Sequence, residues 1–199
     1  MFYLHPHQIK TEKLNTDRFL QCYRAGERDF SQVYIDRASL NDLDLTDINL
    51  CRADLAEANL GCTVLQRANL NRANLKGANL WRANLHRASL VQSQCSKALI
   101  IRADLSRANL YKSKFNDAEI RLACLVGADL QGADLSGANL SYADLSSANL
   151  MGADLTRTIL TGANLSQANF SNTNLDTAVL EGANLESATL PKKIIGCYL

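Results

Sequence analysis

Three kinds of side chain in this 199-residue chain could do chemistry: six cysteines, three histidines and twenty carboxylates. Zinc and catalytic thiols need convergent partners, yet the cysteines show no CxxC spacing and no histidine stands beside Cys95. His86 stands alone, and the sequence offers neither a serine with a plausible histidine and aspartate nor a glycine-rich phosphate loop with a lysine. We therefore predict no enzyme, no catalytic residue, no metal site and no cofactor.

Most of the carboxylates lie inside a repeat of five residues, which is clearest between Gly127 and Leu155. Each quintet has a small residue, usually Ala, then Asn or Asp, then Leu, then two variable residues. The position before the central Leu is Asn or Asp in 21 of 33 quintets, where a short polar side chain can bond the backbone of its own turn. Catalytic carboxylate pairs need unlike environments, which a repeating surface does not offer. These side chains are therefore predicted to be structural.

A period of five residues fits neither a regular helix nor a flat strand. On an α-helix successive leucines would wander around the surface, and in a strand every second Leu would point to the opposite face. The chain must therefore bend once per repeat, with Leu and Ala inside. From Phe30 to Leu190 the register has no insertion, the centre is Leu in 26 of 33 quintets, and the residue two before it is Ala in 24. The pattern predicts an all-β solenoid with a narrow lumen.

The unbroken A(D/N)Lxx tandem resembles the pentapeptide-repeat family over about four fifths of the chain. The run YRAGERDF, from Tyr23 to Phe30, is similar to the lead-in of many cyanobacterial members. The resemblance implies a right-handed quadrilateral β-helix in which four quintets form one coil, so that 33 quintets give about eight coils. Some members of the family resemble B-DNA in size and charge, bind DNA gyrase or topoisomerase IV, and protect it from quinolones.

The repeat divides the chain into residues 1–29, residues 30–190 and a tail of residues 191–199. Asn15 or Thr16 can cap a short helix that ends at Gly26, and we expect this helix to cover the open N-terminal end of the solenoid. The apolar tail residues are expected to fold over the last coil or to form a homodimer contact: Ile194, Ile195, Tyr198 and Leu199. His5 and His7 without further ligands are interpreted as a solvated terminus.

The near-neutral net charge conceals an uneven distribution. Residues 52–114 carry eleven Lys or Arg against three acids, whereas residues 122–190 carry only Arg157 against seven. Many arginines share the second position after the repeat centre: Arg37, Arg52, Arg67, Arg72, Arg82, Arg87, Arg102, Arg107 and Arg157. Seven of the ten glycines occupy the same position, which suggests a positive φ, but Arg there predicts that the turn does not require it everywhere. The belt of arginines is interpreted as a solubilising surface, with nucleic-acid binding as a less favoured alternative because interleaved aromatic residues are sparse.

Stacking the chain in twenty-residue coils brings together one mixed group of outward-facing residues. The group is our candidate protein-binding patch: Trp81, Arg82, Ile101, Arg102, Leu122 and Tyr142. Its combination of aromatic, Arg and aliphatic residues is that of an interface hot spot. The alternative is a set of scattered apolar surface residues.

The leading hypothesis is a non-enzymatic scaffold that binds another protein. Gyrase inhibition by DNA mimicry is the alternative, but it needs a continuous acidic surface and projecting loops, and the uninterrupted register leaves no room for such loops. The sequence shows no signal peptide and no run of eighteen apolar residues, so we predict no membrane span. Free thiols in a reducing compartment indicate a cytoplasmic protein.

Overall fold

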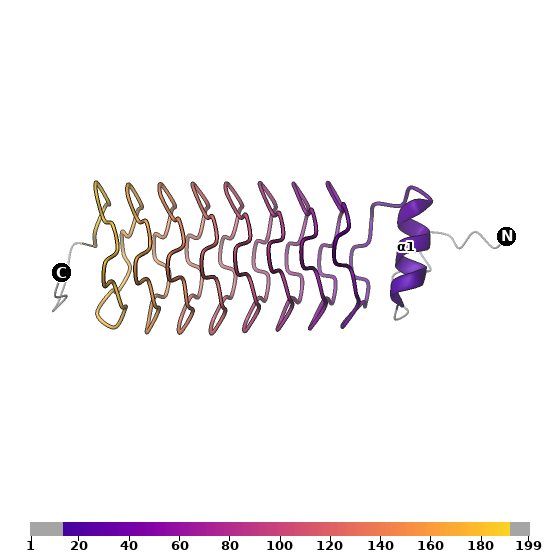
Figure 1. Ribbon diagram of the computed structural model, residues 1–199, viewed down its shortest axis with the longest axis horizontal. Coiled ribbons are helices and arrows are strands. Elements are labelled where there is room, and N and C mark those ends of the chain that lie inside the picture. The colour runs from indigo at the N-terminus through magenta and orange to yellow at the C-terminus, as the bar shows by residue number, and fades with distance from the viewer. Residues whose placement is uncertain (1–13, 192–199) are drawn as a thin grey trace.

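The computed structural model describes residues 14–191, so the predictions for His5, His7, Cys197 and the apolar tail residues lie outside the described part. The described chain forms one helix followed by a long stack of coils (Figure 1). Helix α1 spans Thr16–Arg24, and its N-cap is Asn15, whose side chain accepts a hydrogen bond from Arg18 N at 2.8 Å. Gly26, with φ of 99°, directly follows the C-cap residue Ala25. None of the described helices is long and apolar enough to cross a membrane.

The coils are joined by isolated parallel bridges, each between residues twenty positions apart. The first bridge pairs Asp29 with Asn49 and the last pairs Asn169 with Thr189. Four quintets therefore close one coil, and each side of the coil contributes a single bridging residue to a ladder that runs along the rod. The backbone bonds alternate in direction: Asn74 N donates to Ala53 O in the preceding coil, whereas Leu85 N donates to Asp104 O in the following one. Backbone groups at three positions of the repeat are thus bonded between coils, although among residues 14–191 no strand is longer than one residue.

The two inward positions of the repeat build the core. The central residues and the small residues two before them are nearly all buried through the stack, as the repeat predicted. Cys95 replaces Leu at one centre and is fully buried. Thr63 and Thr158 replace Ala, and their hydroxyls donate to the backbone oxygens of Leu40 at 2.7 Å and Leu135 at 2.8 Å. The small-residue column therefore tolerates a hydroxyl because a carbonyl of the wall accepts from it.

The Asn or Asp side chain before each centre closes the following turn. In all 21 quintets that carry Asn or Asp at this position, the Oδ1 atom accepts a hydrogen bond from the backbone N–H two residues later. Several of the amides also donate to the same position of the preceding coil, as Asn69 Nδ2 does to Asn49 Oδ1 at 3.0 Å. The structural role predicted for these side chains is confirmed.

The conformation of the turns differs from the prediction. The second residue after the centre has a positive φ in every described quintet except the one containing Thr177, and 24 of these residues are not glycine. Arg87 and Arg107, for example, both have φ of 56°. The prediction that Arg excludes a required positive φ is therefore wrong, because an unbranched side chain fits the left-handed region at a modest cost. Thr177, which is β-branched, departs from the pattern and accepts a bond from Arg157 N with its hydroxyl at 2.9 Å.

Helix α1 lies against the first coil. The Phe19 ring is fully buried, and its centroid lies 4.4 Å from that of Phe30. Tyr23 Oη donates to Asp44 O at 2.7 Å, and Leu14 N donates to Tyr34 O at 2.8 Å. The α1 region therefore binds two backbone oxygens that the first coil presents at its open end.

Candidate functional site

The coil gives the rod four sides, and one of them carries the predicted patch. We call it the Trp81 side; it consists of the bridging residues and turns around the repeat centres 40, 60, 80 and so on to 180. Its bridges run from Asn79 to Leu99, Glu119, Asn139, Ile159 and Val179 in successive coils. Backbone bonds hold the turns together in the same order, since Arg82 N donates to Ile101 O at 3.0 Å and Leu122 N to Ser141 O at 3.1 Å.

All six residues of the predicted patch lie on the Trp81 side. Trp81, Leu122 and Tyr142 are 42%, 48% and 63% exposed. Arg82 and Arg102 are also exposed, and Ile101 is half-buried. The coil therefore brings the six residues together along one edge of the rod.

The sequence prediction missed three residues of this surface. Leu99, Ile159 and Val179 are 44%, 37% and 44% exposed and lie on the same side. Of the seven exposed large apolar residues in the described part of the chain, six lie on the Trp81 side and only Tyr34 does not. The signal was present in the sequence, because each of the three replaces the Asn or Asp that otherwise closes the turn.

Two aromatic residues of the Trp81 side are held by their neighbours. Trp81 N donates to Asn79 Oδ1 at 3.1 Å, and the Arg82 guanidinium carbon lies 5.3 Å from the centroid of the Trp81 ring. The Tyr142 ring lies over Gly162, where a Cβ atom would be 2.5 Å from Tyr142 Cε1. Because Gly162 has no side chain, the Tyr142 ring can pack against the backbone of the next coil.

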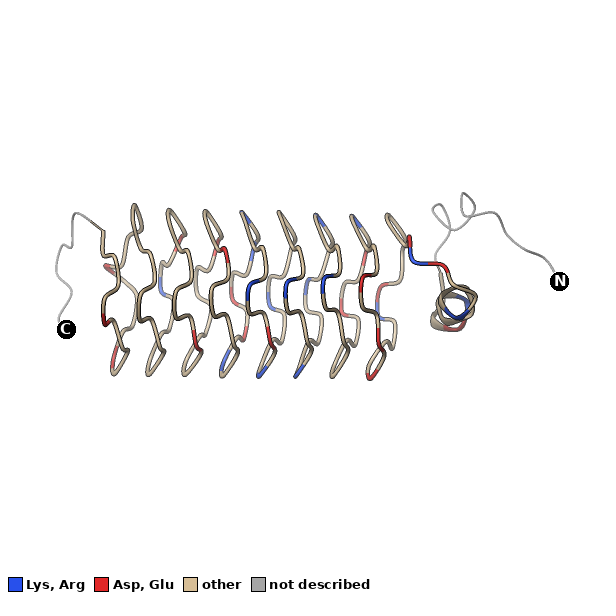
Figure 2. Ribbon diagram, turned by 90° about the horizontal axis from the view of Figure 1, so that it is seen from above, with Lys and Arg blue, Asp and Glu red and all other residues tan. Residues whose placement is uncertain are grey.

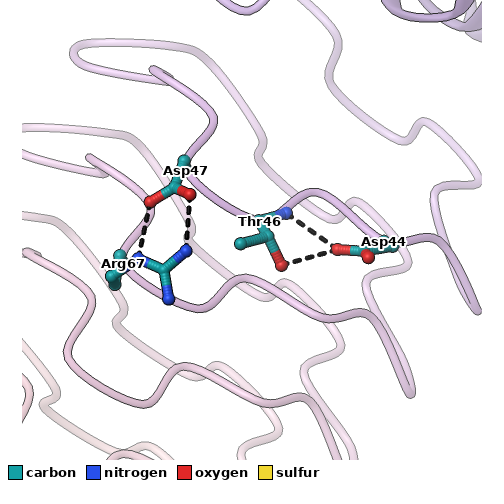
Figure 3. Close-up of polar contacts among 4 residues, drawn as sticks. All are labelled: Asp44, Thr46, Asp47 and Arg67. Atoms are coloured by element: carbon teal, nitrogen blue, oxygen red, sulfur yellow. Dashed lines mark hydrogen bonds and ion pairs between the residues drawn. The ribbon is translucent and has the colours of Figure 1, made fainter.

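The charge of this side is positive near Trp81. Arg82 and Arg102 have no ion-pair partner among the described residues, whereas Arg121 pairs with Glu119 at 3.1 Å. Elsewhere on the rod the basic residues are partly neutralised, as Arg67 is by Asp47 (Figure 3). Figure 2 shows Lys and Arg gathered over the N-terminal and middle coils and thinning toward the C-terminal end. The unpaired guanidinium groups therefore leave a local positive field beside the apolar residues.

A second surface feature lies on a different side of the rod. A groove of about 580 Å³ runs along coils near the N-terminal end and is lined by polar residues, including Asn49, Asn69, Arg52 and Arg72. Arg72 Nε donates to Gln92 Oε1 at 2.9 Å, and Asn71 Oδ1 accepts from Ser89 Oγ at 2.6 Å. Among the lining residues, the side chains of Arg72 and Gln92 and those of Asn69 and Asn49 are thus bonded in pairs.

The prediction that His86 stands alone is wrong. His86 Nδ1 lies 2.8 Å from Ser106 Oγ in the next coil, and Ser106 Oγ donates to Asp104 Oδ1 at 2.5 Å. The serine lies between the histidine and the carboxylate, whereas a nucleophilic triad needs the histidine in the middle to take the serine proton. In this arrangement the Ser106 hydroxyl donates its hydrogen to Asp104 Oδ1, so the imidazole is not placed to take that proton and does not activate the serine.

Cys95, the buried cysteine of the core, lacks the features of a reactive thiol. Burial raises the pKa of the Cys95 thiol to about 12, which keeps it protonated. Five cysteines of the described part are free: Cys22, Cys51, Cys62, Cys95 and Cys124. Among the described residues, no three His, Cys, Asp or Glu side chains are grouped to hold a metal ion.

Comparisons with known proteins agree with the geometry of the coil. The family model described as pentapeptide repeats matches residues 34–71, 68–106, 88–125, 123–157 and 158–192. A search of curated proteins found no significant match.

Solved structures similar to this chain include HetL from the cyanobacterium Nostoc, described as involved in the regulation of heterocyst differentiation. It is 30% identical, with a TM-score of 0.46, and the match covers 88% of this chain and 94% of HetL. A pentapeptide repeat protein from the thylakoid lumen of Arabidopsis thaliana is 36% identical over 43% of this chain and 59% of its own, with a TM-score of 0.42. QnrB1, described as a plasmid-mediated fluoroquinolone resistance protein, is 22% identical over 80% of this chain and 87% of its own, with a TM-score of 0.52. With the family model covering most of the sequence, the chain belongs to the pentapeptide repeat family.

Proposed function

We propose that the protein is a non-enzymatic scaffold that binds another protein through its Trp81 side. The observation that carries the proposal is that six of the seven exposed large apolar residues in the described part lie on this one side. A random scatter over four sides would not place them together. Apolar surface gathered beside Trp, Tyr and Arg is the composition of a binding hot spot.

The cost of this surface to the fold supports the same proposal. Leu99, Ile159 and Val179 occupy the position where Asn or Asp would accept a hydrogen bond from the following turn. An aliphatic side chain at this position has no acceptor, and it leaves carbon exposed to water. A requirement other than stability therefore accounts best for these three replacements.

The architecture proposed with this function is a right-handed quadrilateral β-helix of about eight coils, from the 33 quintets of residues 30–190. Helix α1 serves as its N-terminal cap, supported by the Phe19 ring packed on Phe30 and the bond from Tyr23 Oη to Asp44 O. At the other end, Leu180, Leu185 and Leu190 are only partly buried, and the residue 191–199 tail or a second copy is proposed to cover them. The five free thiols favour a reducing, cytoplasmic setting.

The test is affinity capture of partners from the native organism with matched variants. The combined variant Trp81→Ala, Ile101→Ala and Tyr142→Ala removes the predicted patch, and we expect it to lose the partner. The control variant Tyr34→Ala and Met151→Ala removes apolar groups from other sides and should retain the same partner. Equal recovery by the patch variant and the parent protein would rule out the Trp81 side as the binding surface.

Gyrase protection is a weaker candidate. At 22% identity, the likeness to QnrB1 concerns the fold alone. Mimicry of DNA requires a continuous acidic surface, but residues 52–114, with eleven Lys or Arg against three acids, interrupt the acidic residues before and after them. Four of these carboxylates, Asp129, Asp134, Asp144 and Asp154, already accept backbone bonds within their own turns. A gyrase supercoiling assay with micromolar protein tests this candidate, and the absence of both inhibition and quinolone protection would eliminate it.

A further inference from the structure

We propose that the Trp81 side binds an amphipathic α-helix that carries acidic residues at one end of its apolar face. This inference rests on the proposed function and adds the class of partner. Apolar residues at the bridging and turn positions of successive coils form a row along this side, all exposed except the half-buried Ile101: Trp81, then Leu99 with Ile101, Leu122, Tyr142, Ile159 and Val179. Every one of six successive coils contributes at least one of them.

The length and spacing of the row match a helix. Five steps between coils, each about 4.8 Å, give a row of roughly 24 Å. A helix of about 16 residues has this length at about 1.5 Å per residue. Its apolar side chains recur once per turn, about every 5.4 Å, which is close to the spacing of the coils. Successive turns of the helix can therefore place an apolar side chain near each coil in turn.

The backbone of this side excludes an added strand. Leu99 N donates to Ala78 O at 2.9 Å, and Ile100 N donates to Glu119 O at 2.7 Å, so the backbone groups along the row are bonded between coils. A peptide that adds a strand needs a free sheet edge, and the flank of this stack offers side chains instead. The partner must then satisfy its own backbone hydrogen bonds, as a helix does.

The charges indicate the chemistry of the helix and which of its ends lies over Trp81. Arg82 and Arg102 lie at the Trp81 end of the row and have no ion-pair partner among the described residues. At the other end, Gly162 and Gly182 occupy the positions equivalent to these arginines, and the acid Glu181 lies beside them. Acidic residues of the partner are therefore expected over Arg82 and Arg102, while the other end of the helix lies toward Val179 and the Gly182 turn, which carry no positive charge.

Trp81 allows the proposal to be tested directly, because it is the single tryptophan of the chain and lies within the row. The probe is a synthetic helical peptide of about 18 residues with Leu at helical spacing and Glu beside the Leu row at one end. We expect saturable binding that shifts Trp81 emission to shorter wavelength. A matched peptide with Lys in place of Glu should bind at least about tenfold more weakly. A third peptide with two central prolines, which cannot form the helix, should not bind.

The decisive variant restores the repeat at three positions and removes three aliphatic residues of the row. Leu99→Asn, Ile159→Asn and Val179→Asn introduce a side chain of the kind, Asn or Asp, that closes the turn in 21 other quintets, so the fold should be retained, as thermal unfolding will report. We expect this variant to bind the Glu peptide at least about tenfold more weakly than the parent. The control is Tyr34→Asn, which makes the same exchange at the same repeat position on another side and should leave binding unchanged.

The outcomes separate this inference from the proposed function. Absence of binding by the Glu peptide, or equal binding of the Glu and Lys peptides, would overturn the acidic helix. If affinity capture still depends on Trp81, Ile101 and Tyr142 in that case, the scaffold function stands and the partner is of another class. Equal binding of the Glu peptide by the parent and the triple Asn variant would show that Leu99, Ile159 and Val179 do not contact the helix and would overturn the row as its binding surface.

Discussion

Arg67 and Asp47 join adjacent coils through two hydrogen bonds, from Nε to Oδ1 at 2.7 Å and from Nη2 to Oδ2 at 2.5 Å (Figure 3). The two side chains are 52% and 59% exposed, so water and salt screen the pair. We therefore expect Arg67→Gln to change the midpoint of thermal unfolding by about 2 °C at most. Calorimetry at low and high salt checks this expectation, and a much larger loss would mean that the pair determines the stacking of these coils.

Stability should fall in acid because three aspartates have a lowered pKa. Asp44 Oδ1 accepts from the Thr46 hydroxyl at 2.6 Å and from Thr46 N at 3.0 Å, and these bonds lower the pKa of Asp44 below its ordinary 3.8 (Figure 3). Bonds from Thr156 lower the pKa of Asp154 in the same way, and the bond from Arg67 lowers that of Asp47. In the unfolded chain each carboxyl returns to about 3.8, so the folded state binds fewer protons near that pH.

The stabilisation from these three groups is thus complete above their unfolded pKa and is lost as the pH falls through the folded pKa. We expect the free energy of unfolding in urea to decrease below about pH 4. The combined variant Asp44→Asn and Asp154→Asn should show a shallower decrease. An unchanged slope in this variant would assign the acid sensitivity to other groups.

The φ of 56° at Arg87 predicts how the stability of variants at this position ranks. Glycine adopts this conformation freely, whereas a β-branched residue is strained there. We expect Arg87→Val to be less stable than Arg87→Gly by about 1 to 2 kcal/mol, with the parent protein between them or close to Arg87→Gly. Urea unfolding of the three proteins measures the difference. Equal stability of the Val and Gly variants would show that the turn can relax out of the left-handed region, as it does at Thr177.

The buried Leu and Ala positions and the bonds from Asn or Asp to the turns were predictable from the sequence. Each depends on one residue type at one repeat position. Leu and Ala alternate with Asn or Asp, and the chain has few ways to bury the first two while bonding the third. The positive φ at Arg87 was not predicted because the need for it comes from closing the coil, which the side chain does not reveal. A residue type only favours one backbone conformation over another, whereas the geometry of the closed coil requires the left-handed one at this position.

The sequence predicted only those residues of the candidate site that lie in turns, because the twenty-residue spacing was applied to the turn positions alone. Trp81 and Tyr142 occupy turn positions, where an aromatic residue is conspicuous, whereas Leu99 and Ile159 look like single departures from the repeat. Only when all bridging positions are stacked by twenty residues do they fall on the Trp81 side. The same stacking places His86 beside Ser106, which the sequence interpretation overlooked.

Cys95 should be unreactive in the folded protein. The thiol is fully buried and burial raises its pKa to about 12, so almost no thiolate is present near pH 8. We expect a thiol reagent to modify Cys51, Cys62 and Cys124, which are half-buried, and to reach Cys95 only after unfolding in urea. Mass spectrometry of peptides before and after unfolding identifies the modified residues. Rapid labelling of native Cys95 would contradict the closed core at this coil.

The effect of packing the Tyr142 ring against Gly162 can be measured separately from the strain of a positive φ in the turn. Gly162 and Gly152 have nearly the same φ, 64° and 66°, but a Cβ atom would meet the Tyr142 ring only at Gly162, since nothing lies within 4 Å at Gly152. Both Gly162→Ala and Gly152→Ala should therefore suffer the strain of a positive φ, about 1 kcal/mol. Gly162→Ala should in addition displace the Tyr142 ring.

A double-mutant cycle isolates the contact with the ring. We expect Gly162→Ala to be less stable than Gly152→Ala by up to about 1 kcal/mol in urea unfolding, and this difference to vanish when Tyr142→Ala is present in both. Because Tyr142 belongs to the proposed binding row, Gly162→Ala should also weaken binding of the Glu peptide, whereas Gly152→Ala should not. If the two alanine variants are equally stable and bind the peptide equally, the ring moves aside without cost and Gly162 does not position it.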